Sequence, residues 1–156
     1  MIVTINTDAS YSHAKNRGTF AFWIVSNSGK IKMSGVLKES VISPTMAEMQ
    51  CIINALYVTL NNSGWVNIGK IIINTDSLNS IHVLTKNESA IKKYNLKKYR
   101  QCKAYSEFYK LIKDYKGQIE LRHVRSHNGT DTANKWVNEW CDQEAKKEMN
   151  KLLKTL

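Results

Sequence analysis

The chain has little of what marks secreted, membrane or linker-rich proteins. Its 156 residues include one proline, seven glycines and three cysteines. No apolar run approaches the roughly 20 residues that span a bilayer, and no basic leader precedes one. The cysteines, Cys51, Cys102 and Cys141, show no paired or metal-binding spacing. We therefore expect reduced thiols, a cytoplasmic location, no membrane partner and one domain over residues 1–156.

Negative charge is also scarce, because 13 Asp and Glu stand against 23 Lys and Arg and leave a net charge of +10. Such a charge attracts polyanions, of which nucleic acid is the commonest. A basic surface that only keeps the protein in solution is the alternative. A hydrophobic content of 42% excludes a disordered chain. No large apolar stripe is left over for a second subunit, so we expect a monomer, and we expect no small-molecule cofactor.

Hydrophobic periodicity predicts an α/β chain. Alternating and β-branched residues predict three antiparallel strands, over 2–7, 19–26 and 31–37. A buried helix over 46–60 follows, with Pro44 near its first position. The remaining pattern predicts a strand, two helices, a strand and a last helix over 70–75, 77–84, 103–115, 118–124 and 133–156. Helices are the usual crossovers between parallel strands, so the order βββαβααβα predicts a five-stranded mixed sheet.

Two of the predicted strands end in the same four residues, Ile5-Asn6-Thr7-Asp8 and Ile73-Asn74-Thr75-Asp76. If these strands are parallel neighbours, Asp8 and Asp76 meet where open α/β sheets bind their ligands. Asp76 could instead cap the following helix. Asp8 is followed by Ala9-Ser10-Tyr11 and not by a helix, so a capping role has little support there.

Two further carboxylates lie in predicted helices. Glu48 has apolar residues at the i+3, i+4, i+7 and i+8 positions, which place it on a core-facing stripe where a carboxylate needs a cation or a donor. Its alternative role is to complement the helix dipole. Asp142 follows Asn138 by one i+4 step in the last helix. Read alone, Asp142 is an ordinary solvated carboxylate.

Together these segments resemble ribonuclease H of type 1. Asp8-Ala9-Ser10 resembles the family's first Asp-Gly-Ser, Thr45-Met46-Ala47-Glu48 its glutamate-bearing helix, and Thr75-Asp76-Ser77 its third motif. Residues 124–129 and 137–142 resemble the family's Gly-His-x-Gly loop and its Asn-Glu-x-x-Asp helix start. The matches cover nearly the whole chain in the family's order. They imply a ribonuclease H-like fold with helices on both faces of the sheet.

The resemblance implies a metal-dependent endoribonuclease that hydrolyses the RNA strand of RNA/DNA hybrids. Asp8, Glu48, Asp76 and Asp142 would hold two Mg²⁺ ions, with Mn²⁺ as the alternative, because hard divalent ions prefer oxygen ligands. Asp131 replaces Asp142 if the alignment slips between them. By the same resemblance, His127 would assist product departure or proton transfer, and Asn138 would support the metal and water cluster. Without such a role, His127 is an exposed loop histidine.

A basic stretch with interleaved tyrosines lies between Glu88 and Glu107, where the sequence has no acidic residue. In the family this place often holds a basic protrusion that would grip DNA phosphates; a solvated helical face is the alternative. The residues that would bind nucleic acid there are Lys92, Lys93, Lys97, Lys98 and Arg100. Three more, Asn16, Ser43 and Thr45, fall near family contacts to sugar or phosphate.

The chain departs from the family's pattern at three positions. Ala9 replaces the usual Gly, Pro44 stands where a polar contact residue is common, and Leu78 stands where the family often has Gln. These departures bear on selectivity for hybrids more than on cleavage. Rival functions on the same fold are a 3′-to-5′ exonuclease or an integrase-like strand-transfer domain. A non-catalytic hybrid- or duplex-binding module is a further rival, against which the full set of carboxylates argues.

Overall fold

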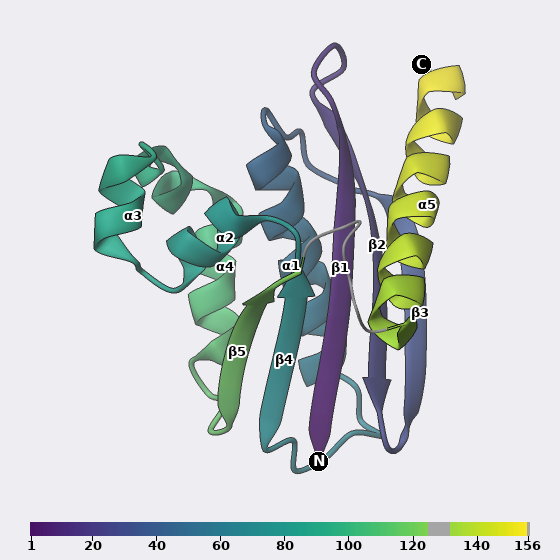
Figure 1. The fold of residues 1–156 in the computed structure, drawn as a ribbon, viewed down its shortest axis with the longest axis vertical. Helices are drawn as coiled ribbons and strands as arrows, with labels where there is room; N and C mark the ends of the chain where they lie inside the picture. Colours follow the sequence, from purple (N-terminus) through teal and green to yellow (C-terminus); the bar gives the residue numbers. More distant parts are fainter. Residues whose placement is uncertain (125–131, 156) are drawn as a thin grey trace.

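The computed structural model describes residues 1–124 and 132–155, which form a mixed sheet flanked by helices (Figure 1). The strand order is β3-β2-β1-β4-β5. β1, β2 and β3 pair antiparallel, whereas β4 is parallel to both β1 and β5. The predicted five-stranded mixed sheet is therefore confirmed. The strands are β1 (Ile2–Ser12), β2 (Arg17–Ser26), β3 (Gly29–Val36), β4 (Lys70–Thr75) and β5 (Gln118–His123).

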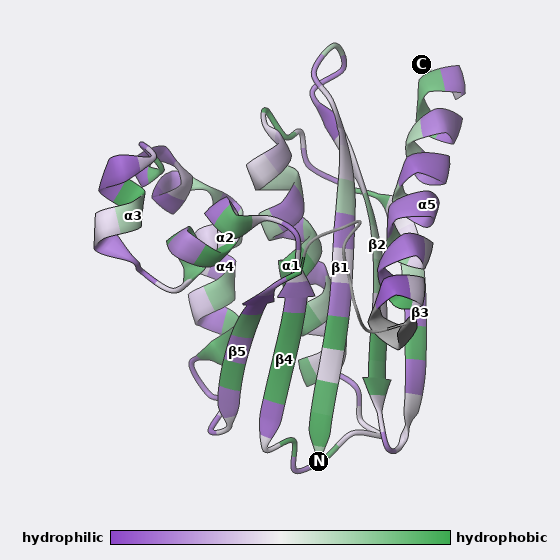
Figure 2. Cartoon of the chain, viewed as in Figure 1, coloured by the Kyte–Doolittle hydropathy of each residue, from purple (hydrophilic) through white to green (hydrophobic). Residues whose placement is uncertain are grey.

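The helices cover both faces of the sheet, as predicted. Apolar side chains of β1, β2 and β4 pack against α1 and α4 on one face, while Ala21 and Trp23 of β2 pack against Cys141 and Ala145 of α5 on the other. Neighbouring strand residues point to opposite faces, so one strand serves both cores. Figure 2 shows hydrophobic residues along the strands and helices that meet there. The helices are α1 (Pro44–Leu60), α2 (Leu78–Leu84), α3 (Glu88–Lys93), α4 (Lys103–Ile112) and α5 (Thr132–Thr155).

The segment between α2 and α4 differs from the sequence prediction, which gave it no regular structure. It contains α3 and the 3-10 helix η1 (Lys97–Gln101). Asn87 begins α3 because its side chain accepts a hydrogen bond from the backbone N–H of Ala90. Ile91, Leu96 and Tyr99 are buried and alternate in sequence with exposed lysines. These few large side chains pack the segment against the core.

Among the element ends, those of β1 and α4 differ most from the prediction. β1 continues to Ser12 and not to residue 7, because its polar second half pairs with the first half of β2. α4 ends at Ile112, three residues earlier than predicted.

The residue at which α1 begins determines which turn of the helix contains Glu48. Ser43 is the N-cap, and its hydroxyl accepts a hydrogen bond from the N–H of Met46 at 3.1 Å. Pro44 occupies the first position, where a missing N–H costs nothing. Glu48 consequently lies in the second turn of α1. Within the described residues, no helix is both long and apolar enough to cross a membrane.

Candidate functional site

The two copies of the Ile-Asn-Thr-Asp sequence lie side by side in the sheet. β1 and β4 are parallel, with Ile5 opposite Ile73 and Asn6 opposite Asn74. The ladder between these strands extends no further than Asn6 and Asn74, so the aspartates follow just beyond the last paired residues. The condition under which Asp8 and Asp76 would meet, that these strands are parallel neighbours, is therefore met. Their carboxyl ends therefore form one edge of the sheet.

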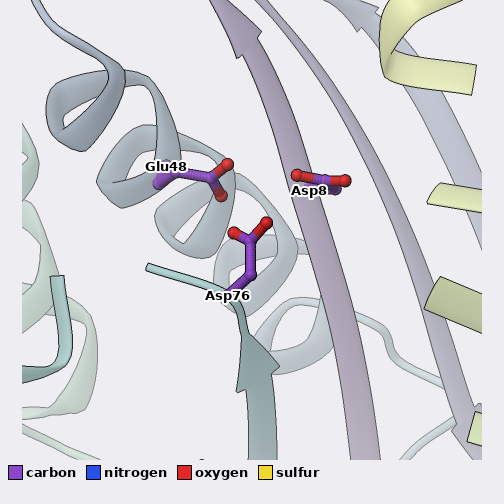
Figure 3. A group of neighbouring side chains, drawn as sticks. All are labelled: Asp8, Glu48 and Asp76. Atoms are coloured by element: carbon purple, nitrogen blue, oxygen red, sulfur yellow. The ribbon is translucent and has the colours of Figure 1, made fainter. Parts of the chain in front are cut away.

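At this edge the structure brings Asp8, Glu48 and Asp76 together. Each offers one carboxylate oxygen, and the three oxygens lie within 4.8 Å of one another. Asp8 comes from β1, Glu48 from α1, and Asp76 directly follows β4 (Figure 3). Asp8 and Glu48 are each only 8% exposed, whereas Asp76 is more accessible. Three carboxyl groups from distant parts of the chain thus share one partly buried space.

The alternative roles considered for Asp76 and Glu48 do not hold. Ser77, and not Asp76, caps α2, because its hydroxyl accepts a hydrogen bond from the N–H of Ser80 at 3.2 Å. Glu48 lies beyond the first turn of α1, which contains no acidic residue. Neither carboxylate is therefore explained by helix capping or by the dipole of the first turn.

Few donors reach the buried carboxylates. The N–H of Ala9 donates to Oδ1 of Asp8 at 2.9 Å and to Oε1 of Glu48 at 3.1 Å. The second oxygen of Glu48, Oε2, is buried and has no hydrogen-bond partner among the described residues. A buried acceptor without a partner is costly. A divalent cation would satisfy it, and an all-oxygen donor set suits Mg²⁺ or Mn²⁺.

Burial and the nearby carboxylates raise the proton affinity of Asp8 and Glu48. Burial, and then the charge of Asp76, raises the pKa of Asp8 to about 7, although a hydrogen bond with Glu48 and the N–H of Ala9 oppose this. Burial, and then the charges of Asp8 and Asp76, holds the pKa of Glu48 well above its usual range. Without a cation the cluster keeps protons near neutral pH. A bound cation would favour the ionised carboxylates and release those protons.

α5 approaches the cluster from the other face of the sheet. Asn138 lines a small pocket with Thr7, Asp8 and Asp76. Asp142 is not one of the three carboxylates within 4.8 Å, but its charge contributes to the raised pKa of Asp8. One Asp142 oxygen accepts an ion-pair hydrogen bond from Lys146 at 2.9 Å. The structure therefore places Asn138 and Asp142 beside the site without making Asp142 part of the tight group.

Two predicted residues, His127 and Asp131, lie outside the described residues. Their roles stay predictions, as does the choice between Asp131 and Asp142 as the fourth carboxylate.

The predicted basic protrusion lies on α3 and η1, away from the sheet in Figure 1. Lys92, Lys93, Lys97 and Lys98 are exposed, whereas Arg100 is half-buried and ion-paired with Glu88 of α3. The Nζ atoms of Lys93 and Lys98 lie 5.4 Å from the ring centroids of Tyr94 and Tyr99. The four lysines thus form an exposed positive surface, hereafter the lysine surface, from which Arg100 differs by its internal partner.

The other three predicted contact residues lie in different surroundings. Asn16 is exposed in the turn between β1 and β2, at a φ of 51°. The hydroxyl of Ser43 is engaged in capping α1, and Thr45 is only 8% exposed. Asn16 is therefore the most accessible of the three. Sequence reasoning did not single out the N–H of Ala9, because a main-chain donor leaves no mark in the residue type.

The sequence model of the RNase H family matches residues 1–150. The chain therefore belongs to the RNase H family. This membership, together with the fold, supports a nuclease that acts on RNA/DNA hybrids. A search among curated proteins gives no match.

Similar solved structures have the same fold. RNase H1 from the halophilic archaeon Halobacterium salinarum NRC-1 is 16% identical with a TM-score of 0.64, over 97% of this chain and 99% of that one. The N-terminal RNase H domain of Rv2228c from Mycobacterium tuberculosis is 13% identical with a TM-score of 0.66, over 99% and 97%. The PFV RNase H domain is 15% identical with a TM-score of 0.62, over 94% and 92%. At these identities the likeness concerns the fold alone.

Proposed function

We propose that this protein is a type 1 ribonuclease H, an endonuclease that uses divalent metal to hydrolyse the RNA strand of RNA/DNA hybrids. The observation that carries the proposal is the convergence of Asp8, Glu48 and Asp76, with the buried Oε2 of Glu48 lacking a donor in the part of the chain that the structure describes. Family membership supplies the reaction class. The net charge of +10 suits a polyanionic substrate.

Asp8, Glu48 and Asp76 would hold the metal, with Asp142 contributing from α5. Mg²⁺ is the ion we propose, in a pair, with Mn²⁺ as the alternative. When bound, two such ions supply an activated water and stabilise the charge of the leaving oxygen. Asn138 lies beside Asp8 and Asp76, where its amide could hydrogen-bond water or a phosphate oxygen. His127 would assist proton transfer or product departure.

The substrate would be held by charge at a second place. Lys92, Lys93, Lys97 and Lys98 are free of ion pairs within the described residues and would contact phosphates of the DNA strand, with Arg100 in a lesser role. Asn16, Ser43 and Thr45 would contact sugar or phosphate near the site. We further propose that residues 1–156 act as one domain, as a monomer and in the cytoplasm.

A hybrid with uniformly labelled RNA tests the proposal. Incubation with Mg²⁺ should give internal RNA fragments, and neither EDTA-treated protein nor Asp8→Asn should cleave. Double-stranded DNA and single-stranded RNA, as parallel substrates, should stay intact. Mononucleotide products would favour the exonuclease and joined strands the strand-transfer enzyme. Hybrid binding without metal-dependent cleavage would leave only the binding module.

A further inference from the structure

A pair of buried asparagines lies directly behind the metal-binding edge. Asn6 is 3% exposed and Asn74 is 6% exposed, and the Nδ2 of Asn74 donates to the Oδ1 of Asn6 at 3.0 Å. They are also the last residues paired in the β1–β4 ladder. Each lies two residues before an aspartate of the site. The side-chain bond therefore joins the two strands at the point where their backbone pairing ends.

Repulsion between carboxylates acts on the ends of β1 and β4, just beyond the two asparagines. Beyond the ladder, Asp8 and Asp76 each offer a carboxylate oxygen, and these oxygens lie within 4.8 Å of one another, so the two groups repel each other when both are ionised. Repulsion between them acts to spread the strand ends. The last ladder pair between β1 and β4 lies two residues before the aspartates, so side-chain bonds between these two strands are well placed to resist the spreading.

A second bond acts in the same direction. The hydroxyl of Thr7 donates to the carbonyl oxygen of Asn74 at 3.2 Å, so β1 reaches across to β4 once more. The corresponding Thr75 behaves differently, since its hydroxyl accepts from the N–H of Ser77 at 3.1 Å and shapes the turn into α2. Thr7 and Thr75 occupy the same position in the two identical sequences but have different roles. Thr7 links β1 to β4, whereas Thr75 stabilises the turn that leads into α2.

We propose that the Asn6–Asn74 hydrogen bond sets the separation of Asp8 and Asp76, and with it the fit of the site to a divalent ion. Both asparagines are then positioning residues, because they act on the metal through the aspartates. Amide groups suit this task, since they join the strands without adding charge beside three carboxylates. The inference rests on the proposed metal-dependent function.

The test compares Asn6→Ala, Asn74→Ala and the double variant with the wild type. Mn²⁺ affinity is measured by calorimetry without substrate, and the Mg²⁺ requirement is measured as the concentration for half-maximal cleavage. We expect each single variant to lose about tenfold in metal affinity, the size seen when groups that orient metal ligands are removed. The double variant should lose no more than either single one, because both remove one bond. KM for the hybrid at saturating metal should stay unchanged.

A matched control separates positioning from general loss of stability. Ile73→Val lies in β4 beside Asn74, but on the opposite face, in the core under α1. It should lower the melting temperature and leave Mn²⁺ affinity unchanged. Asn6→Ser and Asn74→Ser keep a polar group too short to span the gap, and serve if the alanine variants do not fold. Amide hydrogen exchange at Thr7 and Thr75 in metal-free protein should be faster in the asparagine variants than in Ile73→Val.

The outcomes distinguish this inference from the proposed function. Wild-type protein that neither binds Mn²⁺ nor cleaves the hybrid would overturn the proposed function. Wild-type protein that does both, beside asparagine variants whose metal affinity falls no further than that of Ile73→Val, would overturn the positioning role alone.

Discussion

The carboxylate site and the lysine surface carry opposite charges in opposite surroundings. Asp8 and Glu48 are buried and fixed by a strand, a helix and a shared N–H, whereas the four lysines stand exposed on α3 and η1. A buried charge interacts strongly with a ligand, but only in one geometry. Exposed charges are screened by salt, so each contributes little and their contributions to binding add up. One substitution should therefore disable the carboxylate site, whereas only several together should disable the lysine surface.

The largest effect is expected from Asp8→Asn, which removes a proposed metal ligand with almost no change in shape. Loss of several kcal/mol of transition-state stabilisation corresponds to a fall in kcat on the order of 1,000-fold or more. Hybrid binding should change little, because the lysine surface is intact. Single-turnover cleavage and a filter-binding assay measure the two quantities. Asp114→Asn, an exposed change after α4, is the control and should keep full activity.

The same substitution should stabilise metal-free protein at alkaline pH. The pKa of Asp8 is raised from 3.8 in the unfolded chain to about 7 in the fold, so its ionisation costs stability as the pH rises through that window. At pH 8 the wild type loses up to about 4 kcal/mol that Asp8→Asn retains. At pH 3 the difference should vanish. Urea unfolding in EDTA at both pH values measures it, and a gap that does not depend on pH would contradict the assignment.

Removing the whole lysine surface should give an intermediate effect on binding alone. With Lys92, Lys93, Lys97 and Lys98 all changed to Ala, KM for the hybrid should rise on the order of tenfold near 0.1 M salt, with kcat preserved. The dependence of KM on salt should also become shallower, since fewer counterions are released. Four exposed lysines elsewhere that also have no ion pair among the described residues, Lys113, Lys116, Lys147 and Lys154, form the matched control. An equal rise in KM for both sets would mean that only net charge matters.

The smallest effect is expected from Glu88→Gln. Glu88 is the ion-pair partner of Arg100 and the acidic residue nearest in sequence to the lysine surface. Its neutralisation frees a positive charge and should lower KM by about two- to threefold at low salt, a change typical of an exposed pair. The gain should disappear at high salt. A KM that rises would show that Arg100 must be held by Glu88 to act.

The sequence predicts much of the carboxylate site because each part of it has a local mark. The repeated Ile-Asn-Thr-Asp sequence indicated that Asp8 and Asp76 would meet if their strands were parallel neighbours, and the spacing of apolar residues predicted that Glu48 faces the core. These marks depend on strand alternation and helix period, which the residues themselves display. The N–H of Ala9 and the Asn6–Asn74 bond depend on the register between strands, which local patterns do not contain.

The lysine surface shows the opposite case. Its charge is plain in the sequence, but α3 and η1 are too short for a periodic pattern, and their existence depends on a few buried residues such as Ile91 and Leu96. The pairing of Arg100 with Glu88, twelve positions apart, follows from how these short helices fold back. Sequence alone therefore shows which stretch of the chain carries the positive charges, but it could not tell which of them is already paired with a carboxylate.

The contact made by Ala9 has a consequence for how much this site can vary. Two carboxylates depend on an atom that every amino acid except proline supplies, and Ala9 is not among the described residues with positive φ. A methyl group where the ribonuclease H family usually has glycine therefore leaves the contact intact. Natural relatives of this chain should tolerate several small side chains at this position, with proline excluded throughout.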